Sequence, residues 1–180
     1  MNVITTAIPG VVIIEPRVFG DSRGYFYESF SDKEFKEKVC NTTFVQDNQS
    51  CSGKGVLRGL HFQKTHPQAK LVRALKGEVF DVAVDLRKGS ETYGQWVGVL
   101  LSEENKRQFM GPRGFAHGYL VVSDYAEFAY KCTDFYHPDD EGGLLWNDPE
   151  IGIEWPIPEE MELTLSEKDT KWPGIASFGK

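Results

Sequence analysis

The sequence predicts an all-β fold, a sandwich or barrel built from about ten short strands. Short β-branched and aromatic runs alternate with turn residues along the chain, and only one segment has a clear helical pattern. Aromatic residues are abundant, with 12 Phe, 7 Tyr and 4 Trp, and these types favour sheets and pocket walls. Because no internal repeat or linker divides the chain, we expect one domain over residues 1–180.

The first two strands are expected at residues 3–7 and 11–15, which are β-branched runs separated by Pro9-Gly10. Residues 25–30 alternate next, so that Glu28 lies between aromatic side chains on one face. This carboxylate could bond a ligand, or it could face solvent on an edge strand.

The one clear helix is expected to begin at Ser31. Ser31 and Glu34 have the spacing of a capping box, and Phe35 and Val39 lie one turn apart on the same face. The sequence therefore predicts a short helix that packs through its aromatic side.

A strand is expected at residues 44–50, where Gln46, Asn48 and Ser50 share a face. Each side-chain amide needs several hydrogen-bond partners, so this face suits either a polar ligand or an interface.

Residues 79–86 alternate cleanly, with an apolar face opposite Asp81 and Asp85. We expect these two aspartates to face solvent, although Asp81 could instead bond a cationic side chain that itself contacts a ligand.

Residues 93–102 and 107–110 have the pattern of a hairpin closed by the polar turn 103–106. The glycines of segment 111–118 then imply tight turning, and they place His117 at the start of the next strand.

Residues 125–132 place Tyr130 on the apolar face of a strand. On this pattern alone a core tyrosine with a bonded hydroxyl is favoured over a functional one. The tail 134–180 is rich in Pro and Gly, and it predicts loops with one helical turn near Ser166.

Composition limits the class of protein. With 27 acidic and 20 basic residues the net charge is −7, which argues against nucleic acid as a partner and leaves an anionic small molecule possible. Cys40, Cys51 and Cys132 are odd in number and lack CxxC spacing, which is typical of reduced thiols in the cytoplasm. No signal peptide pattern and no membrane-spanning apolar run is present, so we expect a soluble cytoplasmic protein.

Residues 55–77 combine Arg58, His61, Lys70 and Arg73 with two apolar strand patterns. A buried charge that lacks a partner costs several kcal/mol, so this concentration predicts a pocket. His61 could exchange protons near neutral pH while the cations hold an enolate or an anionic substrate. The alternative is a hydrogen-bonded structural histidine with cations that extend to solvent.

The parity of this stretch raises one difficulty. Arg58 and His61 are an odd number of residues apart, so a regular strand would direct them to opposite faces. We therefore expect a bulge or similar irregularity near Gly59.

Seven segments in order resemble the dTDP-4-dehydrorhamnose 3,5-epimerase family. They are DSRGYFYE at 21–28, FVQDNQS at 44–50, RGLHFQ at 58–63, PRGFAHG at 112–118, YKCTDFYHP at 130–138, EGGLLWNDP at 141–149 and SEKD at 166–169. The resemblance covers nearly the whole chain, and it implies a cupin-type jelly roll with a few short peripheral helices. It also implies a homodimer that needs no metal and no redox cofactor.

The family inverts carbons 3 and 5 of a 4-keto-6-deoxyhexose bound to dTDP, on the route to dTDP-L-rhamnose. The resemblance implies that His61 is the base, Asp169 its carboxylate partner and Tyr130 the acid on the opposite side of the sugar. The implied substrate-binding positions are Arg23, Phe26, Glu28, Gln46, Asn48, Arg58, Lys70, His117, Glu141 and Lys168. In the family some N-terminal positions reach the neighbouring subunit's pocket.

Two geometric expectations follow from this assignment. Asp169 should lie within hydrogen-bond reach of His61, because a carboxylate on the second ring nitrogen fixes the tautomer of the base. His61 and Tyr130 should face one compartment, because inversion needs proton removal from one side and delivery from the other.

Three alternative functions are open. A metal-dependent cupin oxygenase is disfavoured because Phe62 and Gln63 follow His61, where an HxH motif would need a second histidine. A non-catalytic sugar or nucleotide binder would not need an acid and a base in one pocket. An epimerase that acts at carbon 3 or carbon 5 alone, or a keto-sugar isomerase, is closer in chemistry.

Overall fold

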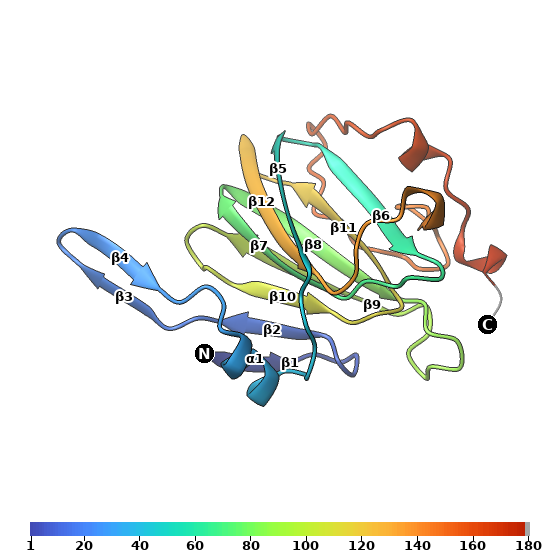
Figure 1. Cartoon of the computed structure of the whole chain (residues 1–180). Coiled ribbons are helices and arrows are strands. Elements are labelled where there is room, and N and C mark those ends of the chain that lie inside the picture. The colour runs from blue at the N-terminus through green and yellow to red at the C-terminus, as the bar shows by residue number, and fades with distance from the viewer. Residues whose placement is uncertain (179–180) are drawn as a thin grey trace.

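The computed structural model describes residues 1–178 as a sandwich of two antiparallel sheets, with residues 179–180 outside the described part (Figure 1). The six-stranded sheet has the order β1-β2-β10-β7-β12-β5 and the five-stranded sheet the order β13-β6-β11-β8-β9. The strands of the first sheet are β1 (Asn2–Thr5), β2 (Val12–Glu15), β10 (Gln108–Gly111), β7 (Lys70–Lys76), β12 (Tyr125–Cys132) and β5 (Gln46–Gly53). Those of the second are β13 (Glu141–Gly143), β6 (Leu57–Gln63), β11 (Phe115–Val121), β8 (Glu78–Asp85) and β9 (Trp96–Ser102). The predicted all-β class is confirmed.

Three apolar clusters stabilise the fold, and two of them bury the faces of the five-stranded sheet. One lies between the sheets and contains Val72, Phe109 and Phe128 of the first sheet with Val79 and Ala83 of the second. The other lies on the outer face of the five-stranded sheet, where the chain from Leu144 onward covers it with buried side chains. Its members include Leu60, Val82, Val84, Ala116, Leu144, Ile151 and Ile175. The five-stranded sheet is therefore buried on both faces.

The prediction that Asp81 and Asp85 face solvent is wrong, because both faces of their sheet are covered and both side chains are 0% exposed. The alternation itself is as expected, but the even-numbered side chains pack under the C-terminal segment while the aspartates face the interior of the sandwich. Asp85 is bonded to Arg87, Ser90 and Thr92, whereas Asp81 is bonded to His117.

The expected hairpin between residues 93–102 and 107–110 is also wrong. β9 pairs with β8 in one sheet, whereas β10 pairs with β2 and β7 in the other. The turn between them, which includes Lys106 at a φ of 53°, carries the chain from one sheet to the other. Sequence pattern defines the turn but not the sheet that each strand joins.

The strands β3 (Val18–Asp21) and β4 (Gly24–Tyr27) form a separate hairpin that projects from the sandwich (Figure 1). Its side chains are mostly exposed, including Phe26 at 71%. Its base is fixed to the six-stranded sheet, because Arg73 donates to the hydroxyl of Tyr27 at 3.1 Å.

The predicted helix is α1 (Asp32–Lys38), and the Ser31 hydroxyl accepts a hydrogen bond from the amide of Glu34. Phe35 is buried against Phe30 and Phe44, as the pattern indicated. Three single-turn helices, η1 (Pro138–Asp140), η2 (Lys168–Thr170) and η3 (Ile175–Ser177), lie in the C-terminal part, and η2 is the turn expected near Ser166. Among residues 1–178 no helix is long and apolar enough to cross a membrane.

Candidate active site

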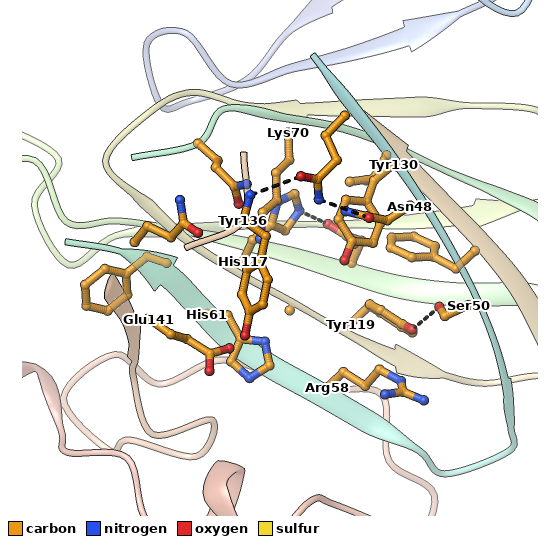
Figure 2. A pocket seen from close by; sticks show the side chains of 18 of the residues that line it. Asn48, Ser50, Arg58, His61, Lys70, His117, Tyr119, Tyr130, Tyr136 and Glu141 are labelled. Atoms are coloured by element: carbon orange, nitrogen blue, oxygen red, sulfur yellow. Dashed lines mark hydrogen bonds and ion pairs between the residues drawn. The ribbon is translucent and has the colours of Figure 1, made fainter. Parts of the chain in front are cut away.

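A cavity of about 430 Å³ opens between the two sheets (Figure 2). Side chains from β5, β7 and β12 of one sheet and from β6, β8 and β11 of the other line it. Nine of the residues expected at the site lie on its wall: Gln46, Asn48, Arg58, His61, Lys70, His117, Tyr130, Glu141 and Lys168. Segments far apart in the sequence thus meet at one polar cavity.

Asp169 lies beside His61, as expected. The Oδ1 atom of Asp169 is 2.5 Å from Nε2 of His61, and Trp172 Nε1 donates to the same oxygen at 3.0 Å. The amide of Gly59 donates to Oδ2 at 3.3 Å. Burial would raise the pKa of Asp169, but the hydrogen bond and charge of His61 and the other two donors lower it to about 2. The carboxylate is therefore ionised and orients the imidazole.

The irregularity expected near Gly59 is present. The register between β6 and β11 shifts between the His117–His61 pair and the Tyr119–Arg58 pair, and Gly59 has a φ of +119°. A Cβ at Gly59 would lie 2.6 Å from the Gly118 Cα atom, so only glycine fits there. Because of this shift, Arg58 and His61 line the same cavity.

Tyr130 faces the cavity from the opposite sheet, on β12. Its ring packs near Phe128 at 6.0 Å between centroids. Burial raises the pKa of Tyr130 to about 12, so the phenol keeps its proton at neutral pH and can act as an acid. His61 and Tyr130 therefore share one compartment, which confirms the second geometric expectation.

Lys70 adds an ammonium group to the interior, and His117 adds hydrogen-bonding capacity. Burial lowers the pKa of Lys70, while the nearby thiol of Cys132 and the carboxylates of Asp81 and Glu141 oppose that effect. The ammonium lies 5.7 Å from the ring centroid of Tyr130. The ring of His117 is bonded through Nε2 to Asp81.

The mouth of the cavity has its own charged pair. Lys168 on η2 donates to both oxygens of Glu141 on β13, at 2.8 and 2.9 Å. Arg58 is exposed and bonds only the hydroxyl of Ser52 among the hydrogen bonds of the described residues. Its guanidinium is free to meet an anionic ligand.

Three of the expected binding residues do not reach this cavity. Arg23, Phe26 and Glu28 lie on or beside the projecting hairpin, where Arg23 pairs with Asp21. Their own chain leaves them exposed to solvent.

The structure also adds residues that sequence reasoning had not selected. Tyr136 enters from the loop after β12, and Figure 2 shows its side chain directed into the cavity toward His61 and Glu141. Its amide donates to Gln46 Oε1 at 3.0 Å, which fixes the loop at the rim. Tyr119 lies deeper and shares a 2.8 Å hydrogen bond with Ser50. The loop carries two adjacent aromatic residues, Phe135 and Tyr136, which was the available signal, although it does not show which of the two lines the cavity.

In residues 1–178 no three His, Cys, Asp or Glu side chains are grouped so that they could hold a metal ion. The reactive groups are the His61–Asp169 pair, the buried phenol of Tyr130 and the cations Lys70 and Arg58. Together with the β-sandwich, they define an acid–base enzyme for an anionic substrate.

Comparison with known proteins identifies the family. The family model described as dTDP-4-dehydrorhamnose 3,5-epimerase matches residues 5–177. The epimerase of Salmonella typhimurium is 59% identical over 175 residues, which cover 96% of this chain and 94% of that protein. The chain therefore belongs to the dTDP-4-dehydrorhamnose 3,5-epimerase family, and it is an epimerase of dTDP-L-rhamnose biosynthesis.

Solved structures agree with this assignment. The Legionella pneumophila epimerase, solved with dTDP-4-keto-L-rhamnose, superposes with a TM-score of 0.93 at 56% identity and covers 96% of this chain and 92% of that one. The Bacillus anthracis epimerase, solved with TDP and PPi, has a TM-score of 0.92 at 43% identity, with coverage of 97% and 99%. The implied cupin-type fold is thus confirmed by structural similarity.

Proposed function

We propose that this chain converts dTDP-4-dehydro-6-deoxy-D-glucose to dTDP-4-dehydro-L-rhamnose by inverting carbons 3 and 5. The observation that carries this proposal is the arrangement of His61, bonded to Asp169, and Tyr130 on different sheets around one cavity. An acid and a base that approach a flat intermediate from two sides are what inversion requires.

His61 acts as the base in this proposal. Both carbons flank the ketone at carbon 4, so removing either proton gives an enolate with charge on one oxygen. The Asp169 carboxylate holds Nε2 of His61, which leaves the other nitrogen to take the proton. General acid–base catalysis of this kind contributes roughly 10²- to 10⁴-fold.

Tyr130 returns the proton on the other face. Its raised pKa keeps the phenol protonated until the enolate forms. Lys70, with His117 or Arg58, stabilises the enolate oxygen, and one such donor is typically worth about 2.7 to 4 kcal/mol. After each inversion, proton exchange with solvent restores His61 and Tyr130.

We assign substrate binding to the remaining cavity residues and to the hairpin. Arg58 and Lys168 are suited to the diphosphate, since guanidinium and ammonium groups bind phosphate oxygens. Gln46, Asn48 and Glu141 supply polar contacts to the sugar or the thymine ring of the substrate. Arg23, Phe26 and Glu28 contact substrate from the hairpin of a second copy, because they cannot reach the cavity of their own chain.

The functional unit is then a homodimer of single-domain chains. Phe19, Tyr25 and Phe26 are 51%, 62% and 71% exposed on the hairpin, and exposed aromatic side chains in such number mark an interaction surface. A cytoplasmic location fits the three free cysteines, because structural disulfides are rare there.

The test is incubation with dTDP-4-keto-6-deoxyglucose in D₂O, followed by NMR. The proposal requires deuterium at both carbon 3 and carbon 5 of the product. Exchange at one carbon alone would favour the single-centre epimerase, and a bound but unchanged sugar would favour the non-catalytic binder.

A further inference from the structure

Asp81 is the one residue of the described chain with a fully buried side-chain oxygen or nitrogen atom that has no hydrogen-bond partner. The residue is 0% exposed and lies on the wall of the cavity. One oxygen, Oδ1, is bonded to Nε2 of His117, and the other, Oδ2, is unpaired. An unsatisfied buried acceptor costs about 1 to 3 kcal/mol, so its presence in a functional cavity calls for an explanation.

Lys70 is the complementary group. It lies on β7 of the opposite sheet, and it lines the same cavity as Asp81. Residues 1–178 contain no carboxylate within ion-pair distance of its ammonium. Each charge nevertheless acts on the other: Lys70 favours the ionised form of Asp81, and Asp81 favours the charged form of Lys70.

The His117 ring is enclosed on its remaining sides. Phe109 meets it edge to face at 5.9 Å, and a Cβ at Gly111 would lie only 3.4 Å from Nδ1. The bond from Nε2 to Asp81 therefore sets how this ring is turned within the cavity.

We propose that Asp81 is a positioning residue of the epimerisation: one oxygen holds the His117 ring, and the unpaired oxygen places a negative charge on the wall of the cavity that the Lys70 ammonium also lines. The inference rests on the proposed function, in which Lys70 stabilises the enolate oxygen. Asp81 itself does not touch the reacting carbons.

Electrostatics supports this role. Burial raises the pKa of Asp81, but the positive charges of His117 and Lys70 oppose that effect. The other titratable groups around this cavity are His61 and Arg58 from β6, Tyr119 from β11, Tyr130 and Cys132 from β12, Tyr136 from the loop after β12, Glu141 from β13 and Lys168 from η2. Glu141 is already paired with Lys168, which leaves Asp81 as the interior carboxylate available to Lys70.

The central experiment is the pH profile of kcat/KM for Asp81→Asn. Asparagine keeps the shape and can still accept a hydrogen bond from His117, but it removes the negative charge. Lys70 then loses its proton more easily as pH rises. We expect the alkaline limb to move to lower pH by about one unit, so that kcat/KM falls by about tenfold at pH values above both limbs.

Asp85→Asn is the matched control. Asp85 is equally buried on the same strand, but its partners are Arg87, Ser90 and Thr92, outside the cavity. This variant should unfold at a lower temperature while its alkaline limb stays at the wild-type position. A shift of the same size in Asp85→Asn would overturn the proposal, because the effect would then be structural.

A second measurement does not depend on epimerase activity. The folded protein is labelled with acetic anhydride at a series of pH values and then digested, and mass spectrometry measures the labelling of the Lys70 peptide. The extent of labelling reports the protonation state of the Lys70 amine directly. Asp81→Asn should lower the midpoint of Lys70 labelling by about one unit. If the wild-type enzyme incorporates no deuterium at carbons 3 and 5 in D₂O but the labelling midpoint still shifts, the proposed function is wrong and the influence of Asp81 on the charge of Lys70 is confirmed. If neither the limb nor the labelling midpoint moves, the inference is wrong.

Discussion

The His61 Nε2 and Asp169 Oδ1 atoms lie 2.5 Å apart although 108 positions separate the two residues in the chain. The C-terminal segment first covers the outer face of the five-stranded sheet and then brings η2 to the edge of β6. The same segment therefore stabilises the sandwich and completes the catalytic pair.

Replacement of Asp169 by Asn should leave the protein folded and lower kcat by roughly 10²- to 10⁴-fold. The amide preserves volume but no longer fixes the tautomer of His61 or stabilises its charged form. Steady-state kinetics, with thermal unfolding as the folding control, measures this. A variant within threefold of wild type would show that the pair is structural.

The same pair contributes to stability with a defined pH dependence. Because the folded-state pKa of Asp169 is lowered to about 2, its contribution is fully present above the unfolded value of about 3.9 and is lost as pH falls toward 2. The difference in unfolding free energy between wild type and Asp169→Asn should therefore be constant from pH 5 to 7 and shrink below pH 4. Denaturant unfolding across this range measures it; a difference that grows on acidification would contradict the assignment.

Tyr130 should titrate far later than an ordinary tyrosine. Burial raises its pKa to about 12, so its phenolate should be absent at pH 10 to 11, where exposed tyrosines titrate. Ultraviolet difference spectra of wild type and Tyr130→Phe isolate this one ring. Phenolate absorbance assigned to Tyr130 at pH 10 would show that the phenol is not buried as described.

Substitution of Gly59 by Ala should destabilise the protein and disturb the catalytic pair. The new Cβ would lie 2.6 Å from Gly118 Cα and 2.7 Å from the His117 carbonyl oxygen, and the φ of +119° is unfavourable for alanine. We expect a loss well above 1 kcal/mol. Gly89→Ala is the control, since its φ is +76° with open space around it. Equal losses in the two variants would rule out the steric explanation.

A mixing experiment tests the shared site. Arg23→Ala and His61→Ala homodimers should each be poorly active, but mixed dimers contain one site with an intact hairpin and an intact base. Random exchange should restore about a quarter of the wild-type activity. No recovery, with exchange verified by mass, would show that Arg23 serves its own chain or none.

Local patterns predicted those parts of the fold that local interactions control. The Ser31 cap, the inward face of Tyr130 and the irregularity at Gly59 all follow from spacing within a few residues, and the structure contains each of them. The shared polar face of Gln46 and Asn48 is likewise part of the cavity wall.

The wrong predictions concern partners that are distant in sequence. Nothing near Asp81 or Asp85 shows that a C-terminal segment covers the other face of their strand. The turn before β10 has ordinary hairpin chemistry, yet the strands on its two sides join different sheets. Tyr136 was missed because its loop reaches the cavity through Gln46, which lies 90 positions away.

The most direct test of the account follows Tyr130→Phe with the sugar nucleotide in D₂O. His61 can still remove a proton and return a deuteron on the same side, so we predict slow deuterium exchange in the substrate with its configuration retained. Loss of inversion with retained exchange, read by NMR at carbons 3 and 5, is the expected result. Formation of the inverted product by this variant at the wild-type rate would contradict the two-sided mechanism.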